Sequence, residues 1–223
     1  GLTLGGTDEQ GADASNELTE LVLHAYARMR LRQPNLHLRM HAGTPAWLRA
    51  LACETIVEGG GMPALFNDAA IVPALVQQGI GEPLARDYSI VGCVEWGVPG
   101  RSFPAAGAGF VSLAAVLDET LHDPSLHGAT SIDAIWLAYR TRLAARVEEA
   151  VRGNEAIEQA HARWRPTPLL SLCVRGCIAA GRDVTRGGAE IDSTGLQGVG
   201  VADVADSLAA IEQLVFEERL LDL

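Results

Sequence analysis

A repeated alternation of strands and helices in the first 90 residues limits the folds open to this chain. Residues 36–41 alternate between apolar and polar side chains, which is typical of a strand with one polar face. That polar face consists of His37, Arg39 and His41, and it either lines a site or is solvated. The expected strands span residues 36–41, 63–66 and 88–91, and the expected helices span residues 13–31, 44–57, 67–78 and 82–86. This rhythm predicts an α/β protein with parallel strands.

The second half of the chain predicts helices joined by glycine-rich segments. Glycine or proline breaks up residues 96–109, so we expect a long loop there, of the kind that often carries function. Within it, Arg101 is either an anion-binding side chain or an ordinary surface arginine. A second glycine-rich stretch, residues 181–200, does not match a dinucleotide-binding fingerprint. The remaining expected helices span residues 110–121, 131–164, 169–180 and 203–215, and the third of these is expected to be buried.

Composition excludes several classes of protein. The net charge of -11 argues against a nucleic-acid-binding surface and leaves no basic patch for anionic lipid. No apolar run approaches the roughly 20 residues of a membrane helix. We therefore expect a cytoplasmic protein with no nucleic-acid or membrane partner.

The cysteines and histidines predict no metal site. The spacing of Cys53, Cys93 and the pair Cys173 and Cys177 matches neither a zinc site nor a disulfide framework, so we expect reduced thiols. His37 and His41 stand four positions apart in an extended strand, which is too far for one metal ion. We expect no bound metal.

A thiol and a carboxylate stand two positions apart where a short apolar run ends in Gly92. If the chain stays extended there, Cys93 and Glu95 face the same side, roughly 7 Å apart, and Val94 faces away. That pair is a possible nucleophile or radical carrier beside a possible base. The alternative is a buried, inert cysteine and a surface carboxylate. The residues alone leave both interpretations open.

The segment Gly92-Cys93-Val94-Glu95 resembles the active-site signature of glycyl radical enzymes related to pyruvate formate-lyase. Other blocks resemble the same family in the same order, namely Thr3–Gly6, Asp13–Thr19, Gln33–Leu36, Arg39–Pro45, Asp183–Ala189 and Gly198–Leu208. The resemblance covers nearly the whole chain. It implies a ten-stranded α/β barrel in which a loop carries Cys93 into the interior.

By this resemblance, residues 1–223 form the later part of that barrel domain. The first residue is not Met, and the family's C-terminal glycine motif does not occur in the sequence. We therefore expect a fragment that lacks the N-terminal portion and the glycyl radical domain, and that is inactive alone.

The resemblance also implies the chemistry. A glycyl radical outside this chain, installed by a radical-SAM activating enzyme, would take hydrogen from Cys93 to give a thiyl radical. That radical would abstract hydrogen from a small hydroxylated substrate, and Glu95 would act as the general base that helps water or another group to leave. The substrate-binding residues are not predicted, and the full-length protein is expected to be a homodimer.

Single positions distinguish branches of the family. Formate-producing members have two adjacent cysteines, whereas position 92 is Gly, so formate acetyltransferase is disfavoured. Cys-x-Glu resembles the dehydrating and eliminating lyases and also the arylacetate decarboxylases, and we prefer a dehydratase or lyase. Trp96 replaces the usual proline, and Ile191-Asp192 replaces Tyr-Asn, so the substrate is expected to differ. The first alternative is a glycyl radical decarboxylase or formate acetyltransferase, and the second is a non-catalytic barrel remnant that binds a partner or small ligand.

Overall fold

The computed structural model describes residues 1–222 and divides into two compact units. The first unit comprises Gly1–Ala106 and Thr167–Ser193, and the second comprises Gly107–Pro166 and the chain from Thr194 onwards. Among the described residues, no helix is both long and apolar enough to cross a membrane.

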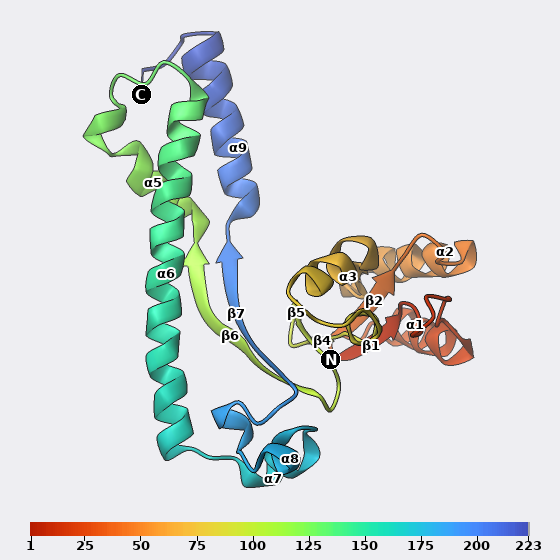
Figure 1. The fold of residues 1–223 in the computed structure, drawn as a ribbon. Coiled ribbons are helices and arrows are strands. Elements are labelled where there is room, and N and C mark those ends of the chain that lie inside the picture. Colours follow the sequence, from red (N-terminus) through yellow and green to blue (C-terminus); the bar gives the residue numbers. More distant parts are fainter. Residues whose placement is uncertain (223) are drawn as a thin grey trace. The chain divides into compact units, whose positions relative to one another are not determined.

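A three-stranded parallel sheet forms the centre of the first unit (Figure 1). Its strands are, in spatial order, β1 (Leu2–Gly5), β2 (Leu36–Met40) and β3 (Ala64–Asn67). Leu38 on the middle strand lies opposite Leu4 on β1 and Leu65 on β3. The predicted parallel α/β architecture is confirmed.

Two helices pack against the apolar positions of β2. They are α1 (Glu17–Met29) and α2 (Ala46–Thr55), the latter continuing into a wider turn, η1 (Ile56–Gly60). Asn16 caps α1 by accepting hydrogen bonds from the backbone of Leu18 and Thr19. The core between helices and strand consists of Leu23, Tyr26, Leu36, Leu38, Leu48, Leu51 and Ala52.

The polar positions of β2 face a second cluster and are buried rather than solvated. The elements on this side are α3 (Asp68–Gln77), α4 (Glu82–Arg86), β4 (Ser89–Val91) and β5 (Glu95–Gly97). Their apolar cluster consists of Val72, Leu75, Ala85, Tyr88 and Ile90. His37 and Arg39 are 1% and 5% exposed. The polar face of this strand is therefore not solvated, because residues of α3 and of the segment that leads into β4 provide its hydrogen-bond partners.

The prediction of one buried helix over residues 169–180 is wrong. Two short helices occur, α7 (Pro168–Cys173) and α8 (Cys177–Ala180), followed by a helical turn, η3 (Val184–Arg186). Helix α7 ends where Val174 adopts an extended conformation, and α8 begins after Gly176, whose φ is +100° and where a Cβ atom would lie 2.7 Å from the Gly188 carbonyl oxygen. Leu169 and Ile178 are exposed. The extended Val174 thus ends the first helix, and the close approach of the Gly188 backbone leaves room only for glycine at position 176.

The prediction of a loop over residues 96–109 is also wrong. After β5, the strand β6 (Ser102–Ser112) pairs with β7 (Ile191–Val199), which lies in the second half of the second glycine-rich stretch. Small residues interrupt the apolar–polar alternation that would predict a strand in both segments. The hydrogen-bond partners of β6 lie on β7, far away in the sequence, so neither strand is evident from its own residues. The expected helix start at residue 110 moves accordingly to residue 113.

Helices build the second unit. Helix α6 (Ile132–Trp164) runs without a break through Gly153 and Asn154, and it lies beside α5 (Leu113–Leu121) and α9 (Val201–Ile211) (Figure 1). The connecting turn η2 (Pro124–Leu126) follows α5, and η4 (Glu212–Glu217) follows α9. The core between these helices includes Val116, Leu117, Ile135, Tyr139 and Val204.

Candidate active site

The segment Gly92-Cys93-Val94 is the three-residue tip of a β-hairpin. Strands β4 and β5 pair antiparallel, with Val91 opposite Glu95. Gly92 has a φ of +66°, which glycine adopts without strain and which turns the chain. The extended conformation on which the spacing argument depended does not occur, because the chain reverses at the glycine. Cys93 and Val94 project from the tip and are exposed.

The turn nevertheless brings the Glu95 carboxylate onto the cysteine. Oε2 of Glu95 accepts hydrogen bonds from the backbone N–H of Cys93, at 3.1 Å, and of Val94, at 3.0 Å. Two N–H donors stabilise the ionised carboxylate and fix its direction. A Cβ atom at position 92 would lie 3.0 Å from the same oxygen, so the glycine also leaves room for it.

Trp96 faces away from the proposed chemistry. Neighbouring residues on a strand point to opposite sides, and Trp96 pairs with Ile90 and packs against the cluster that contains Tyr88. Glu95 therefore lies on the other face of the hairpin. The contacts of Trp96 are thus with the core, which does not support the expectation that its replacement of proline changes the substrate.

Asn35, which the sequence reasoning did not single out, contacts the hairpin tip. Its side-chain Nδ2 donates to the Gly92 carbonyl oxygen at 3.0 Å and lies 3.9 Å from Cys93 Sγ. The only signal in the sequence is its place in the block Gln33–Leu36. Asn35 is 57 residues from Gly92 along the chain, so the contact appears only in the folded protein.

His37 lies next to the Gly92 peptide group, which Asn35 also contacts. The ring is 1% exposed, its centroid is 5.6 Å from that of Phe66, and its Nδ1 has no hydrogen-bond partner. Burial and the positive charge of the N-terminal amine lower the pKa of His37, and a hydrogen bond to the backbone of Gly92 opposes that shift.

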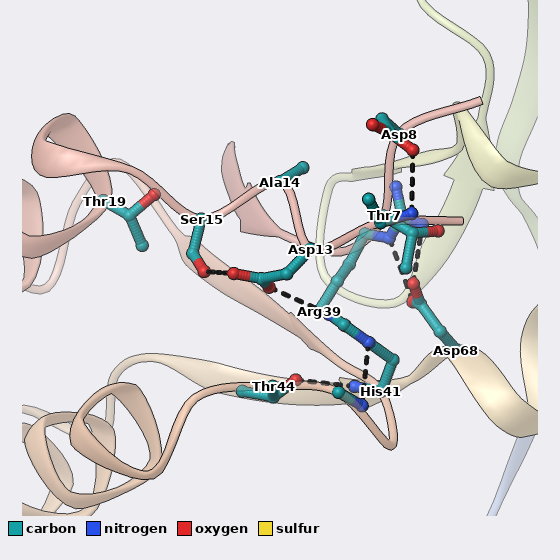
Figure 2. Close-up of polar contacts among 12 residues, drawn as sticks. Thr7, Asp8, Asp13, Ala14, Ser15, Thr19, Arg39, His41, Thr44 and Asp68 are labelled. Carbon is teal, nitrogen blue, oxygen red and sulfur yellow. Dashed lines mark hydrogen bonds and ion pairs between the residues drawn. The ribbon is translucent and has the colours of Figure 1, made fainter. Parts of the chain in front are cut away.

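A buried ionic network fixes the residues that precede the hairpin. Nε and Nη2 of Arg39 donate to the two carboxylate oxygens of Asp68, at 3.0 and 2.7 Å (Figure 2). Nη1 of Arg39 donates to the Tyr88 carbonyl oxygen at 2.9 Å, and the Tyr88 hydroxyl donates to Asp68 at 2.7 Å. Burial and the hydrogen bond to Asp68 raise the pKa of Tyr88 far above its usual value. Since Tyr88 comes directly before β4, this network anchors the base of the hairpin.

The third polar residue of β2, His41, has a different partner. Its Nε2 lies 2.9 Å from Asp13, which also accepts from Ser15 (Figure 2). Its Nδ1 accepts from the backbone N–H of Gly43. Burial tends to raise the pKa of Asp13, but the hydrogen bonds from Ser15 and His41 outweigh it and lower the pKa. His37 and His41 thus lie in separate environments. Among residues 1–222, no three His, Cys, Asp or Glu side chains are grouped to hold a metal ion.

The remaining polar candidates of the sequence serve local structure. Arg101 forms an ion pair with Glu190 at 2.8 Å, so its contact is with the protein. Asp183 accepts from the backbone of Thr167 and Thr185 and from the hydroxyls of Thr185 and Ser171. The Thr185 hydrogen bond is the main cause that lowers the pKa of Asp183 to about 2.

Comparison with known proteins gives one consistent result. The family model described as pyruvate formate lyase-like matches residues 1–223. The chain is 33% identical to the (2S)-3-sulfopropanediol dehydratase of Klebsiella oxytoca, over 98% of this chain and 28% of that protein. It is 31% identical to the trans-4-hydroxy-L-proline dehydratase of Clostridioides difficile, over 100% of this chain and 30% of that protein.

A solved structure agrees. The glycerol-bound B12-independent glycerol dehydratase from Clostridium butyricum superposes with a TM-score of 0.86 at 35% identity. The match covers 99% of this chain and 30% of that one. The chain therefore spans less than a third of the length of the relatives it matches.

Proposed function

This chain belongs to the pyruvate formate lyase-like family, and on that premise we propose that the whole protein is a glycyl radical lyase in which Cys93 carries the radical and Glu95 is the base. The α/β architecture is that of a pyruvate formate-lyase-type barrel. The observation that carries the residue assignment is the hairpin tip, where the Glu95 carboxylate is held by the backbone N–H groups of Cys93 and Val94.

The hairpin suits radical transfer at sulfur. In the proposed enzyme, Cys93 would give its S–H hydrogen atom to a protein-derived glycyl radical outside these 223 residues, which would leave the unpaired electron on the sulfur. The Cys93 side chain is exposed at the tip, so its S–H bond is open to a reacting group. By contrast, Cys177 is buried among Val174 and Val184, which suits packing rather than chemistry.

The first step on the substrate would be the transfer of a hydrogen atom from the substrate to the Cys93 sulfur. The thiyl sulfur takes a hydrogen atom from a substrate carbon that bears a hydroxyl group, so one C–H bond breaks and one S–H bond forms. The unpaired electron then resides on the substrate carbon. Such a step requires contact distance and alignment, which a cysteine on a hairpin with fixed backbone provides.

Glu95 would then move a proton. The hydroxyl on the radical carbon is more acidic than before, and the Glu95 carboxylate removes its proton. The neighbouring group leaves with its bonding electron pair, and when it is hydroxide the proton held by Glu95 converts it to water. The product radical takes back the hydrogen atom from Cys93, so the cycle consumes no oxidant or reductant. General base catalysis of this kind contributes about 10² to 10⁴-fold.

The substrate class we propose is a small hydroxylated molecule whose leaving group stands beside a carbon that bears a hydroxyl or an amine. Two relatives at 33% and 31% identity are named dehydratases, and the similar solved structure holds glycerol. Gly92 replaces the first of the two adjacent cysteines expected of a formate-producing enzyme, which favours elimination over carbon–carbon cleavage. We also propose activation by a radical-SAM enzyme, a homodimeric whole protein and a cytoplasmic location.

A substrate panel tests the reaction class. The intact, anaerobically activated protein is incubated separately with a vicinal diol, a hydroxyproline and an arylacetate. We expect loss of water from the diol or the hydroxyproline, detected as the carbonyl or unsaturated product, and no such product from the Cys93→Ala variant. Release of carbon dioxide from the arylacetate as the only reaction would favour a decarboxylase instead. No product from any substrate despite a full radical signal would support a binding role.

A further inference from the structure

The contacts of the hairpin tip assign a role to a residue outside it. We propose that Asn35 is a positioning residue for Cys93: its side-chain amide holds the sulfur atom and the peptide that precedes it. The proposal rests on the proposed function of Cys93 and adds the residue that orients the thiol.

One amide group reaches both parts of the tip. Nδ2 of Asn35 donates to the Gly92 carbonyl oxygen at 3.0 Å and lies 3.9 Å from Cys93 Sγ, within hydrogen-bond range of a sulfur acceptor. A side-chain amide carries two N–H donors, so it can serve both acceptors at once. The second support of the Gly92 backbone is the buried His37 ring.

The direction of the amide is set by a neighbour. Nε2 of Gln33 donates to Oδ1 of Asn35 at 3.0 Å. With its oxygen satisfied there, Asn35 must turn its N–H groups toward Gly92 and Cys93. The orientation therefore follows from the hydrogen-bond network.

The backbone around Asn35 is also fixed. Its carbonyl oxygen accepts from the Leu2 N–H at 2.8 Å, and the preceding Pro34 carbonyl accepts from the hydroxyl of buried Tyr26. The next residue, Leu36, is fully buried in β2. A side chain on such a rigid support can hold a reactive group within the tolerance that catalysis requires.

A donor at sulfur has a specific consequence for hydrogen-atom transfer. When a sulfur lone pair accepts from Asn35, the S–H bond points in another direction, away from the amide. The hydrogen atom then leaves from and returns to one defined position. Loss of the donor would free rotation about the Cys93 side chain and misalign the transfer.

The first test measures the contact without any reaction of the enzyme. The intact protein is alkylated with iodoacetamide at fixed pH, and the rate at Cys93 is read by mass spectrometry against exposed Cys173 as an internal reference. Asn35→Asp replaces the donor by a carboxylate, which disfavours the reactive thiolate, so we expect Cys93 to react about tenfold more slowly. The matched control Asn16→Asp makes the same change at a helix cap that Asp also serves, and should leave the rate unchanged. An unchanged ratio of Cys93 to Cys173 in Asn35→Asp would overturn the proposal.

A second variant guards against misfolding. Gln33 is exposed, and Gln33→Glu removes the donor to Asn35 Oδ1 while offering an acceptor, so the amide should flip and turn its oxygen toward Cys93. We expect a smaller slowing of Cys93 alkylation in the same direction. The control is Gln10→Glu, at another exposed glutamine. Identical Cys93 rates in both glutamine variants would contradict the orienting role.

A final arm separates this proposal from the proposed function. In the activated protein, Asn35→Asp should reduce turnover by about 10²-fold while the radical signal and the KM stay near wild type. Wild-type turnover of Asn35→Asp beside an inactive Cys93→Ala would refute the positioning role alone. Turnover by Cys93→Ala would refute the proposed function, and the alkylation result would still report on the contact.

Discussion

The hairpin tip and the network of Arg39, Asp68 and Tyr88 are both polar, but they differ in what surrounds them. In the network, every contact joins buried protein groups, and the ion pair is bidentate. At the tip, Oε2 of Glu95 accepts from two backbone N–H groups, and the Cys93 residue remains exposed.

This difference separates anchoring from chemistry. A buried ion pair is costly to disturb, because removal of one partner leaves the other charge buried and unpaired. Its donors and acceptors are engaged with protein groups and not with a ligand. A reactive group on a turn, supported by rigid strands, remains accessible while its backbone is fixed. Tyr88 links the two regions, because it joins the network and directly precedes β4.

The largest effect should come from the tip, without loss of stability. Glu95→Gln keeps an oxygen that accepts from the Cys93 and Val94 backbone, but it removes the base. We expect turnover to fall by about 10² to 10⁴-fold, with an unchanged urea midpoint. The control Glu190→Gln, at the Arg101 ion pair, should keep full activity. An equal loss in both variants would mean that charge, rather than the base, matters.

The network should show the opposite pattern. Asp68→Ala leaves the buried Arg39 charge without its partner, so we expect the free energy of unfolding to fall by about 3 to 5 kcal/mol, measured by urea denaturation. The exposed ion pair of Asp118 and His122 provides the control, and Asp118→Ala should cost about 0.5 kcal/mol or less. Similar losses of stability in Asp68→Ala and Asp118→Ala would show that the buried network stabilises the fold no more than a surface ion pair does.

Gly92 tests whether the shape of the tip matters apart from stability. Gly92→Ala and Gly100→Ala both place a side chain at a φ near +66°, and each should cost about 1 to 2 kcal/mol of stability. Space is open around Gly100, whereas a Cβ atom at Gly92 meets the Glu95 carboxylate. We therefore expect reduced turnover only in Gly92→Ala. Equal turnover in the two variants would show that the Glu95 position is not critical.

The smallest effect concerns Asp183, which is hydrogen-bonded as richly as Asp68 but only half-buried. Its pKa is lowered from 3.8 to about 2, so the unfolded chain binds more protons between these values. Its contribution to stability is present above about pH 4 and is lost as the pH falls through about 2. Urea midpoints from pH 5 to 2 should therefore fall more steeply for wild type than for Asp183→Asn. Parallel curves would show that these hydrogen bonds do not perturb its titration.

The sequence predicted the local parts of the fold well and the distant pairings poorly. The strand over residues 36–41 and its flanking helices have strong periodicity, and they are found within a few residues of the expected bounds. The strands β6 and β7 were missed because glycine and alanine give no alternating pattern, and their partners lie about 90 residues apart. The break between α7 and α8 includes an extended Val174 and the approach of Gly188 to Gly176, which no local pattern encodes.

The same limit applies to the site. Cys93 and Glu95 could be proposed from the resemblance, and the assignment of their roles stays a prediction. Their true geometry depends on the φ of Gly92, which an extended spacing argument ignores. Asn35 could not be found from spacing, since folding alone brings it to the tip. Buried Arg39 was assigned only to a polar face, because its partner Asp68 is on another element.

The most direct test of the central claim compares product formed per radical spin in the intact, activated protein. We predict that Cys93→Ala retains the wild-type spin count and urea midpoint but forms no product above background. Cys173→Ala, which removes another exposed thiol, should match wild type in all three measurements. Wild-type turnover per spin in Cys93→Ala would contradict the account, because the hairpin tip would then not carry the chemistry.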